Sequence, residues 1–390
     1  MNASRSKRAS RKPTSMLQIG TVIKNKWKIT QQIGRGAFGE TYCCKDLHSN
    51  TEVAVKIEKL DNKKMVLRLE VIALKKIQSC QQVVRYIHSG RQDDFNFLVM
   101  ELLGSNIAEL RKNMPEQRFS MVTTAKLGIQ MIQALRGVHE LGFIHRDVKP
   151  SNFVVGKKPQ HKNQIFLIDF GLARKYRLAS GEIRPPRKQA GFRGTARYAS
   201  TNSHRSRELS RRDDLWSVFY VIVEFAVGQL PWRKIKSKEK IGELKEQLTK
   251  PSLVKNLPKE FNLILEHLNT LRYADEPDYD RLVRYLETIL HREDADMNAP
   301  WDWEIRENHR RSGSHHTGGS SPAIPPVKQV HGIGDNQEAK KQQFSNIFQN
   351  EDQGGQENPP PSKNAEKYRE ERQPSSKDDK KKCCAGCVIM

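Results

Sequence analysis

Between residues 27 and 58, short β-favouring runs are separated by glycine-rich and polar turn signals. β-Branched and aromatic side chains are frequent in these runs, and such residues fit the pleated surface of a sheet. The pattern therefore predicts three antiparallel strands, at Trp27–Ile33, Glu40–Asp46 and Glu52–Glu58.

A helical pattern follows over Lys64–Gln78, with Leu67, Leu74 and Ile77 on one apolar stripe. Glu70 lies on that same stripe. A buried carboxylate needs a cation or hydrogen-bond donors, because an unpaired buried charge is costly. We expect Lys56 to be its partner. The alternative is that Glu70 reaches solvent at the edge of the helix.

Two longer helices are predicted further along the chain. Ser120 is a suitable N-cap for a helix whose buried face carries Leu127, Met131, Leu135 and Val138. A second, almost wholly apolar helix is expected from Asp214 to Ala226, with Asp214 accepting backbone N–H bonds from the segment around His145 or simply capping the helix.

The segment from His145 to Asn152, followed by Asp169-Phe170-Gly171, has the spacing of a protein-kinase catalytic loop and metal-binding turn. Asp147 is expected to accept the proton of a substrate hydroxyl, and Lys149 to steady the transferred phosphoryl group. Asn152 and Asp169 are the candidate Mg²⁺ ligands. A lysine two residues after the catalytic aspartate is the form found in serine/threonine kinases.

Residues 34–39 fit the G-x-G-x-x-G pattern, which also occurs in dinucleotide-binding folds. Here the glycines join two predicted strands, and a Val-Ala-Val-Lys strand ending at Lys56 follows, so we expect an ATP phosphate loop. The apolar run Phe97–Gly104 is predicted to be a strand and hinge, although a plain core strand would look the same. The candidate ATP-binding residues are Ile33, Gly34, Gly36, Gly39, Thr41, Ala54, Lys56, Met100, Glu101 and Leu103.

These features predict an α+β, bilobal protein-kinase fold: an antiparallel β N-lobe with one main helix, and a mostly helical C-lobe. Composition places this domain at residues 17–305, with lobes at 17–104 and 105–305. Residues 1–16 are expected to be a disordered basic arm, and 306–390 a disordered tail rich in Gly, Ser, Pro and charge.

Charge and cysteine usage narrow the partners and the compartment. The formal net charge of +23 favours anionic partners, but the basic runs lack interleaved aromatics, so nucleic-acid binding is not expected. With no long apolar span or signal core, and six cysteines in no disulfide-like pattern, we expect a cytoplasmic or nuclear protein with reduced thiols, most simply a monomer.

Three further segments resemble the casein kinase 1 superfamily: 191–200, 211–217 and 229–234. Three others are more similar to its tau-tubulin kinase branch: 184–187, 223–232 and 301–304. The resemblance implies a serine/threonine kinase that favours acidic or phosphorylated segments, with tubulin or microtubule-associated proteins as candidate substrates. It also implies that Arg197 binds a substrate anion. The basic run 233–240 could extend that site, although its residues do not align one for one with the superfamily's ligands.

The last four residues, from Cys387 to Met390, form a C-terminal C-a-a-X sequence of the farnesylation type. One prenyl chain binds a membrane weakly, so stable anchoring needs a second signal. Cys383 and Cys384 are candidate palmitoylation sites, and nearby lysines could contact anionic lipid. We therefore expect the protein on the cytosolic face of a membrane; the alternative is an unmodified tail.

Two other functions remain compatible with parts of this pattern. The kinase fold could serve as a membrane-anchored, pseudokinase-like scaffold in which turnover is irrelevant, although Lys56, Glu70, Asp147, Asn152 and Asp169 are all present. A small-molecule kinase is disfavoured by the complete set of protein-kinase motifs.

Overall fold

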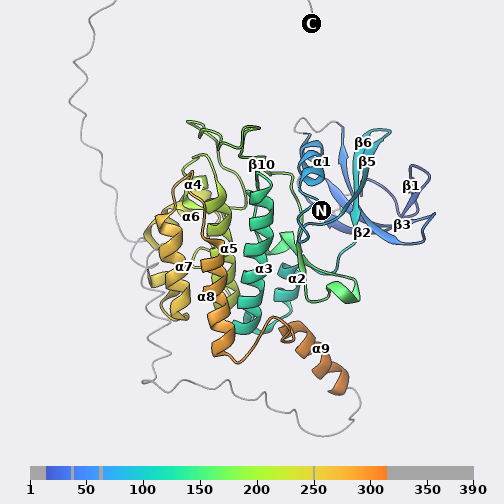
Figure 1. Cartoon of the computed structure of the whole chain (residues 1–390). Coiled ribbons are helices and arrows are strands. Elements are labelled where there is room, and N and C mark those ends of the chain that lie inside the picture. The colour runs from blue at the N-terminus through green and yellow to red at the C-terminus, as the bar shows by residue number, and fades with distance from the viewer. Residues whose placement is uncertain (1–14, 37–38, 61–64, 249–250, 314–390) are drawn as a thin grey trace, which may run out of the picture. The chain divides into compact units, whose positions relative to one another are not determined.

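The computed structural model describes residues 15–36, 39–60, 65–248 and 251–313 (Figure 1). The predicted arm up to residue 14, the tip of the glycine-rich loop at 37–38 and the predicted lipidation sites Cys383, Cys384 and Cys387 lie outside these ranges. Ser15 and Met16 were assigned to the arm, but the backbone N–H of Met16 donates to Glu40 over 2.8 Å, so the ordered lobe begins earlier.

The small lobe is a six-stranded antiparallel sheet in the order β1-β2-β3-β4-β6-β5. The three strands predicted between residues 27 and 58 are present as β2, β3 and β4, with two of them slightly longer than expected. The sheet strands are β1 (Val22–Ile23), β2 (Trp27–Arg35), β3 (Glu40–Asp46), β4 (Glu52–Lys59), β5 (Tyr86–Gln92) and β6 (Phe95–Glu101).

The helix α1 (Val66–Lys76) packs against this sheet (Figure 1), and Glu70 is among its buried residues. Its N-terminus is capped from β4, since the carboxylate of Glu58 accepts the backbone N–H groups of Val66 and Leu67 at 3.0 and 3.2 Å. The helix is shorter than the predicted span, because Ile77 already leaves the helical conformation as the C-cap.

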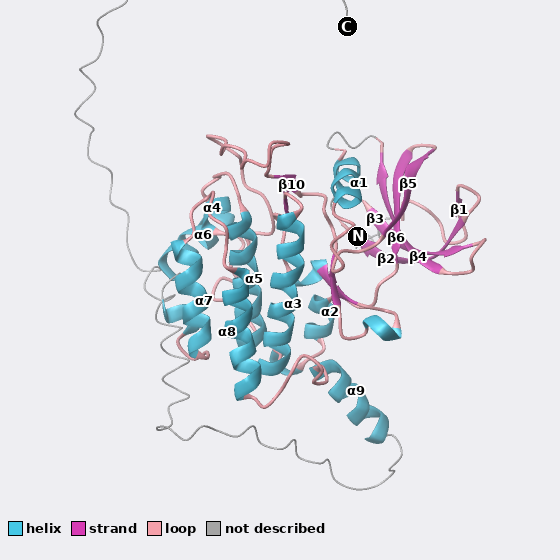
Figure 2. Ribbon diagram, viewed as in Figure 1, coloured by secondary structure: helices cyan, strands magenta, loops and turns pink. Residues whose placement is uncertain are grey.

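The large lobe is built around α3 (Met121–Glu140), which packs against α5 and α8 (Figure 2). Ser120 caps α3 as predicted, accepting the backbone N–H of Thr123 at 3.1 Å. The other helices are α2 (Ile107–Lys112), α4 (Thr201–His204), α5 (Arg211–Val227), α6 (Lys238–Leu248), α7 (Lys259–Thr270), α8 (Tyr279–Arg292) and α9 (Asp302–Gly313).

The prediction that Asp214 opens α5 was wrong. The helix begins at Arg211, and Asp213 receives the backbone N–H of Ser210 at 2.8 Å in the manner of a capping box. Asp214 therefore lies within the first turn. Its carboxylate is free to contact the catalytic loop instead of capping the helix.

Helix α9 continues to Gly313, beyond the domain end predicted at residue 305. It is anchored by the segment before it: Trp301 is fully buried and stacks on Trp303 with ring centroids 4.8 Å apart. Asp302 accepts the backbone N–H of Ser120 at 2.7 Å. These contacts to the start of α3 supply burial that composition alone did not indicate.

Short strands position the catalytic segments between the lobes. β7 (Phe143–Ile144) pairs with β10 (Arg174–Lys175), and β8 (Phe153–Val155) pairs with β9 (Ile165–Leu167). The catalytic loop lies between β7 and β8, and the Asp-Phe-Gly turn lies between β9 and β10. The two strand pairs therefore bring the catalytic loop and the Asp-Phe-Gly turn together beside the helical lobe.

Candidate active site

A cavity of about 900 Å³ is lined by residues of both lobes. All ten residues predicted to bind ATP line it, as do Glu70, Asp147, Lys149, Asn152 and Asp169. Strand register sets one wall of the cavity: Ala54 on β4 lies opposite Met100 on β6, and Thr41 lies opposite Lys56. The sequence motifs therefore converge on one cleft.

The glycine-rich loop needs a glycine at residue 39 for steric reasons. A Cβ at Gly39 would lie 2.0 Å from the backbone oxygen of Ile57, closer than any side chain tolerates. At the other wall, the backbone N–H of Glu101 donates to Arg85 over 3.0 Å. An adenine contact at Glu101 would therefore use its carbonyl group.

Lys56 forms ion pairs with carboxylates from two different segments. Its Nζ lies 2.7 Å from Glu70 Oε2 on α1 and 2.9 Å from Asp169 Oδ1. Burial would lower the pKa of Lys56, but the two carboxylates outweigh it and raise this pKa above the ordinary lysine value. The expected Lys56–Glu70 contact is present, and Glu70, 2% exposed, does not reach solvent.

Asp169 is held as a carboxylate in a left-handed backbone conformation that few residues other than glycine, asparagine and aspartate adopt. Its φ is +66°, in the left-handed region. Burial would raise its pKa, but the ammonium of Lys56 lowers the pKa to about 2. The next residue, Phe170, is fully buried and packs edge-on against His145 with ring centroids 5.1 Å apart. The packed ring fixes the direction of the Asp169 side chain.

Asp147 accepts hydrogen bonds from both sides of the cleft floor. Lys149 Nζ donates to its Oδ2 at 2.5 Å, and the hydroxyl of Thr195 donates to its Oδ1 at 2.7 Å. The side-chain amide of Asn152 donates to the backbone oxygen of Asp147 at 2.9 Å. Thr195 was not among the predicted site residues; its place in the segment 191–200 was the available signal.

Asp214 holds the backbone of the catalytic loop through hydrogen bonds. Its carboxylate accepts the backbone N–H groups of His145 and Arg146 at 2.7 and 2.8 Å, as expected, and also contacts His139 Nε2 at 2.9 Å. Burial would raise the pKa of Asp214, but the hydrogen bond from His139 and the loop N–H groups lower it. The charge of this buried aspartate thus holds the backbone that carries Asp147.

Arg197, the predicted anion-binding residue, is partly exposed and also forms an ion pair inside the protein. Its Nη1 lies 3.7 Å from Glu224 Oε1, and its side chain is 37% exposed. Glu224 is fully buried and is shared with Arg111, at 3.2 Å, and Tyr198, at 2.6 Å. A substrate anion at Arg197 would therefore compete with an internal carboxylate that already has two other partners.

The donor set in the cleft suits a divalent cation that keeps water and phosphate ligands. Asp169 offers a carboxylate held ionised by Lys56, and Asn152 donates its amide nitrogen to Asp147, which leaves the amide oxygen as the ligand atom. Within the described residues, no group of three His, Cys, Asp or Glu side chains could hold a metal by itself. Phosphate oxygens would have to complete the coordination.

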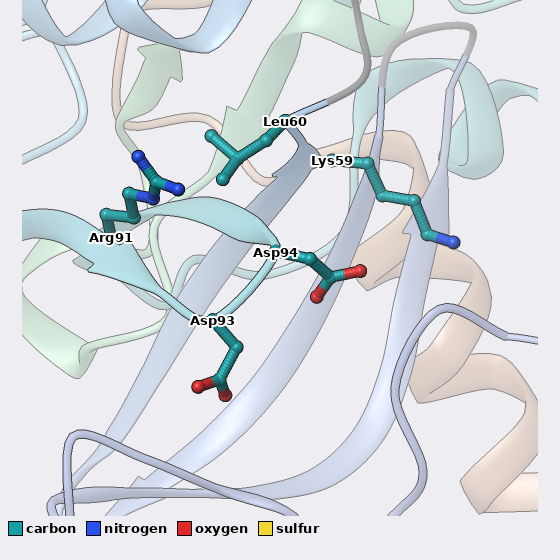
Figure 3. A pocket seen from close by; sticks show the side chains of 5 residues that line it. All are labelled: Lys59, Leu60, Arg91, Asp93 and Asp94. Atoms are coloured by element: carbon teal, nitrogen blue, oxygen red, sulfur yellow. The ribbon is translucent and has the colours of Figure 1, made fainter.

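A smaller hollow of about 330 Å³ lies at the end of β4 and the β5–β6 turn (Figure 3). It is lined by Lys59, Leu60, Arg91, Asp93 and Asp94. Charges of both signs surround it, and none of the predicted catalytic residues lines it. It is therefore not part of the nucleotide cleft.

A family model for the protein kinase domain matches residues 27–289. The chain belongs to the protein kinase family. Kinase domains of this family use ATP and a divalent metal ion. The fold prediction is therefore confirmed.

A curated relative, a probable serine/threonine-protein kinase of Dictyostelium discoideum, is 53% identical over 289 residues. The alignment covers 74% of this chain and 58% of that relative. The chain thus spans little more than half the length of the relative that it matches. Among the residues that the structure describes, no helix has the length and apolar character of a membrane span.

Proposed function

We propose that this chain is a serine/threonine protein kinase that transfers the γ-phosphoryl group of ATP to a protein hydroxyl. The observation that carries the proposal is the convergence of Lys56, Asp147 and Asp169 on one cavity of about 900 Å³. Phosphoryl transfer needs positioning and charge neutralisation more than covalent chemistry from the protein. The cleft offers both.

Each polar group in the cleft has a role in this reaction. Asp147 orients the substrate hydroxyl and accepts its proton, and Thr195 holds the carboxylate at the required angle. Lys149 stabilises the negative charge of the transferred phosphoryl group. Its contact with Asp147 places its ammonium next to the residue that orients the substrate hydroxyl. Lys56 binds the α- and β-phosphates while Glu70 keeps it in position.

Asn152 and Asp169 are proposed to hold Mg²⁺, which would bridge phosphate oxygens and neutralise their charge. The oxygen donors, the ionised Asp169 and the absence of soft ligands from this pair support a hard cation. Asp169 also pairs with Lys56 at 2.9 Å, so the same carboxylate connects the lysine and the cation site.

Purified protein with Mg²⁺-ATP and an acidic serine peptide tests this proposal. We expect phosphopeptide to form, and Asp169→Ala to abolish its formation while leaving the protein folded. Equal incorporation by the wild type and Asp169→Ala would overturn the assignment. Nucleotide binding by a wild type that phosphorylates no peptide would favour the scaffold role.

We further propose that the enzyme belongs to the casein kinase 1 superfamily, near its tau-tubulin kinase branch, and prefers acidic or phosphorylated segments. The partly exposed Arg197 supports this preference, and its backbone oxygen accepts a hydrogen bond from Trp232, directly before the basic run 233–240. Acidic tails of tubulin or microtubule-associated proteins have the matching charge. Arg197→Ala should reduce kcat/KM for an acidic peptide more than for its neutral counterpart; an equal loss would contradict the role.

The C-terminal C-a-a-X sequence supports a membrane tether, provided that Met390 is the natural terminus. Farnesylation at Cys387, with palmitoylation at Cys383 or Cys384, would place the kinase on a cytosolic membrane face. In cells, Cys387→Ser should shift the protein from the membrane to the soluble fraction. An unchanged membrane fraction would remove this proposal, and the kinase proposal would be unaffected.

A further inference from the structure

Lys245 on α6 is fully buried beneath the loop that contains Thr195 and Arg197. Its Nζ donates to the backbone oxygen of Ala196 at 2.8 Å and to that of Ala199 at 2.6 Å. The same Nζ lies 4.6 Å from the ring centroid of Tyr220 and 5.1 Å from that of Trp232. Two carbonyls and two aromatic faces therefore surround one amine.

The surroundings of Lys245 lack the carboxylate that usually accompanies a buried lysine. Among the described residues, no carboxylate lies within ion-pair distance of its Nζ, and burial lowers its pKa well below the ordinary value. Burying a polar amine in this way is costly. Within the part of the chain that the structure describes, the contacts that offset this cost are on the loop and on the two aromatic rings.

Two other side chains bind the same stretch of backbone from different elements. Trp232 Nε1 donates to the oxygen of Arg197 at 2.8 Å, and His204 Nε2 on α4 donates to the oxygen of Ala196 at 3.2 Å. We call Lys245, Trp232 and His204 the carbonyl clamp. It fixes three carbonyls, at Ala196, Arg197 and Ala199, from three places in the sequence.

The clamped loop connects the catalytic aspartate to the proposed substrate side. Thr195, directly before the clamped carbonyls, donates to Asp147 Oδ1 at 2.7 Å. The backbone N–H groups of Tyr198 and Ala199 both donate to the oxygen of Thr195 at 2.9 Å, so the loop is a tight turn. Movement of the Ala196 and Ala199 carbonyls would therefore move Thr195 and Arg197 with them.

We propose that Lys245 is a positioning residue for phosphoryl transfer to a peptide. It holds the loop 195–199 so that Thr195 orients Asp147 and Arg197 faces the substrate. Lys245 touches neither ATP nor the reacting atoms, and it lines no part of the nucleotide cleft. The inference rests on the proposed kinase activity and predicts that peptide use and nucleotide use respond differently to its loss.

The test compares Lys245→Met with wild type and with Lys255→Met, an exposed lysine beyond η4 (Pro251–Val254). Methionine keeps the unbranched chain but removes the donor. We expect kcat/KM for the acidic serine peptide to fall at least about ten-fold in Lys245→Met, because a misplaced reactive group costs rate steeply. We expect the KM for ATP and the slow hydrolysis of ATP without peptide to stay within about two-fold of wild type. Lys255→Met should match wild type in all three.

A second measurement follows the loop directly. Amide hydrogen exchange at Tyr198 and Ala199 should accelerate in Lys245→Met, while exchange in α1 stays as in wild type, because only the clamped turn loses its support. Lys245→Arg keeps donors at this position and should recover part of the peptide activity. A purely structural lysine would lower ATP hydrolysis and peptide phosphorylation together.

The outcomes separate this inference from the proposed function. A wild type that phosphorylates no peptide contradicts the kinase proposal itself. If the wild type is active and Lys245→Met has the same kcat/KM for the peptide, only the role of Lys245 is overturned. The same holds if Lys245→Met loses ATP hydrolysis and peptide phosphorylation in parallel. If Lys245→Met does not fold, Trp232→Phe, which removes the donor to Arg197 together with part of the buried ring, must show the same selective loss of peptide use; unchanged peptide use would overturn the clamp.

Discussion

Lys56 is partly buried and Lys245 is fully buried, and their surroundings shift their pKa values in opposite directions. Lys56 lies between the carboxylates of Glu70 and Asp169, and its pKa is raised. Lys245 lies among carbonyls and aromatic rings, and its pKa is lowered by burial. The ammonium of Lys56 is stabilised as a charge, which suits the proposed contact with phosphate, whereas Lys245 donates hydrogen bonds to backbone oxygens.

This difference separates two tasks that one enzyme needs. Charge neutralisation requires a cation that remains charged beside ATP, and only nearby anions can guarantee that in a partly closed cleft. Holding a substrate loop requires directed N–H groups, for which net charge is secondary. Replacing Lys56 should therefore affect ATP hydrolysis and peptide phosphorylation together, whereas replacing Lys245 should affect peptide phosphorylation alone.

The largest effect is expected from Lys56→Met. Peptide phosphorylation should fall about 10²-fold or more, because an electrostatic contact to the phosphates is lost in a site that excludes water. Both ATP hydrolysis and peptide phosphorylation should fall, unlike the selective loss expected at Lys245. Lys59→Met, an exposed lysine at the end of the same strand, is the matched control. If Lys56→Met kept its ATP hydrolysis, the proposed difference between Lys56 and Lys245 would be wrong.

Stability should distinguish the two lysines next. Lys56→Met leaves buried Glu70 without its cation and should lower the free energy of unfolding by up to about 3 kcal/mol, the low end for a broken buried pair. Adding Glu70→Leu should restore much of that stability but no activity. Lys245→Met leaves no charge behind, so its loss should be about 1–2 kcal/mol, from two carbonyls without a donor. Denaturant unfolding measures both; a larger loss at Lys245 would contradict the argument.

A smaller, pH-dependent effect is expected at His204, the third member of the carbonyl clamp. Burial is the largest cause that lowers its pKa to about 4 from 6.5. As pH falls from about 6.5 to 4, the unfolded chain binds a proton that the folded protein does not. Stability is therefore complete above this window and decreases within it, by at most about 1.4 kcal/mol per pH unit.

His204→Gln keeps an N–H donor for Ala196 but cannot titrate. Its unfolding free energy should therefore depend less on pH between 6.5 and 4 than that of the wild type, measured by denaturant unfolding across this range. His48→Gln, at an exposed histidine in the β3–β4 turn, is the control. Identical pH profiles for wild type and His204→Gln would show that His204 protonates freely in the folded state.

Local sequence predicted the elements whose signals lie in a short window. Ser120 capped α3, the three β-favouring runs became strands, and the spacing from His145 to Asn152 marked the catalytic loop. Strand β5 was missed because its residues alternate little between apolar and polar, and its order depends on pairing with β6. The start of α5 was misplaced because Asp213 and Asp214 offer the same carboxylate one residue apart.

The sequence by itself determined the kinase fold, the cleft residues and the partner of Glu70, because a buried charge on an apolar stripe and motifs of fixed spacing constrain their own surroundings. Only the tertiary structure decided that Thr195 holds Asp147 and that Lys245 binds the loop behind it. An isolated lysine on a charged helix carries no local sign of burial. Its environment is made by Tyr220, Trp232 and a loop some fifty residues away, and such contacts exist only once the chain has folded.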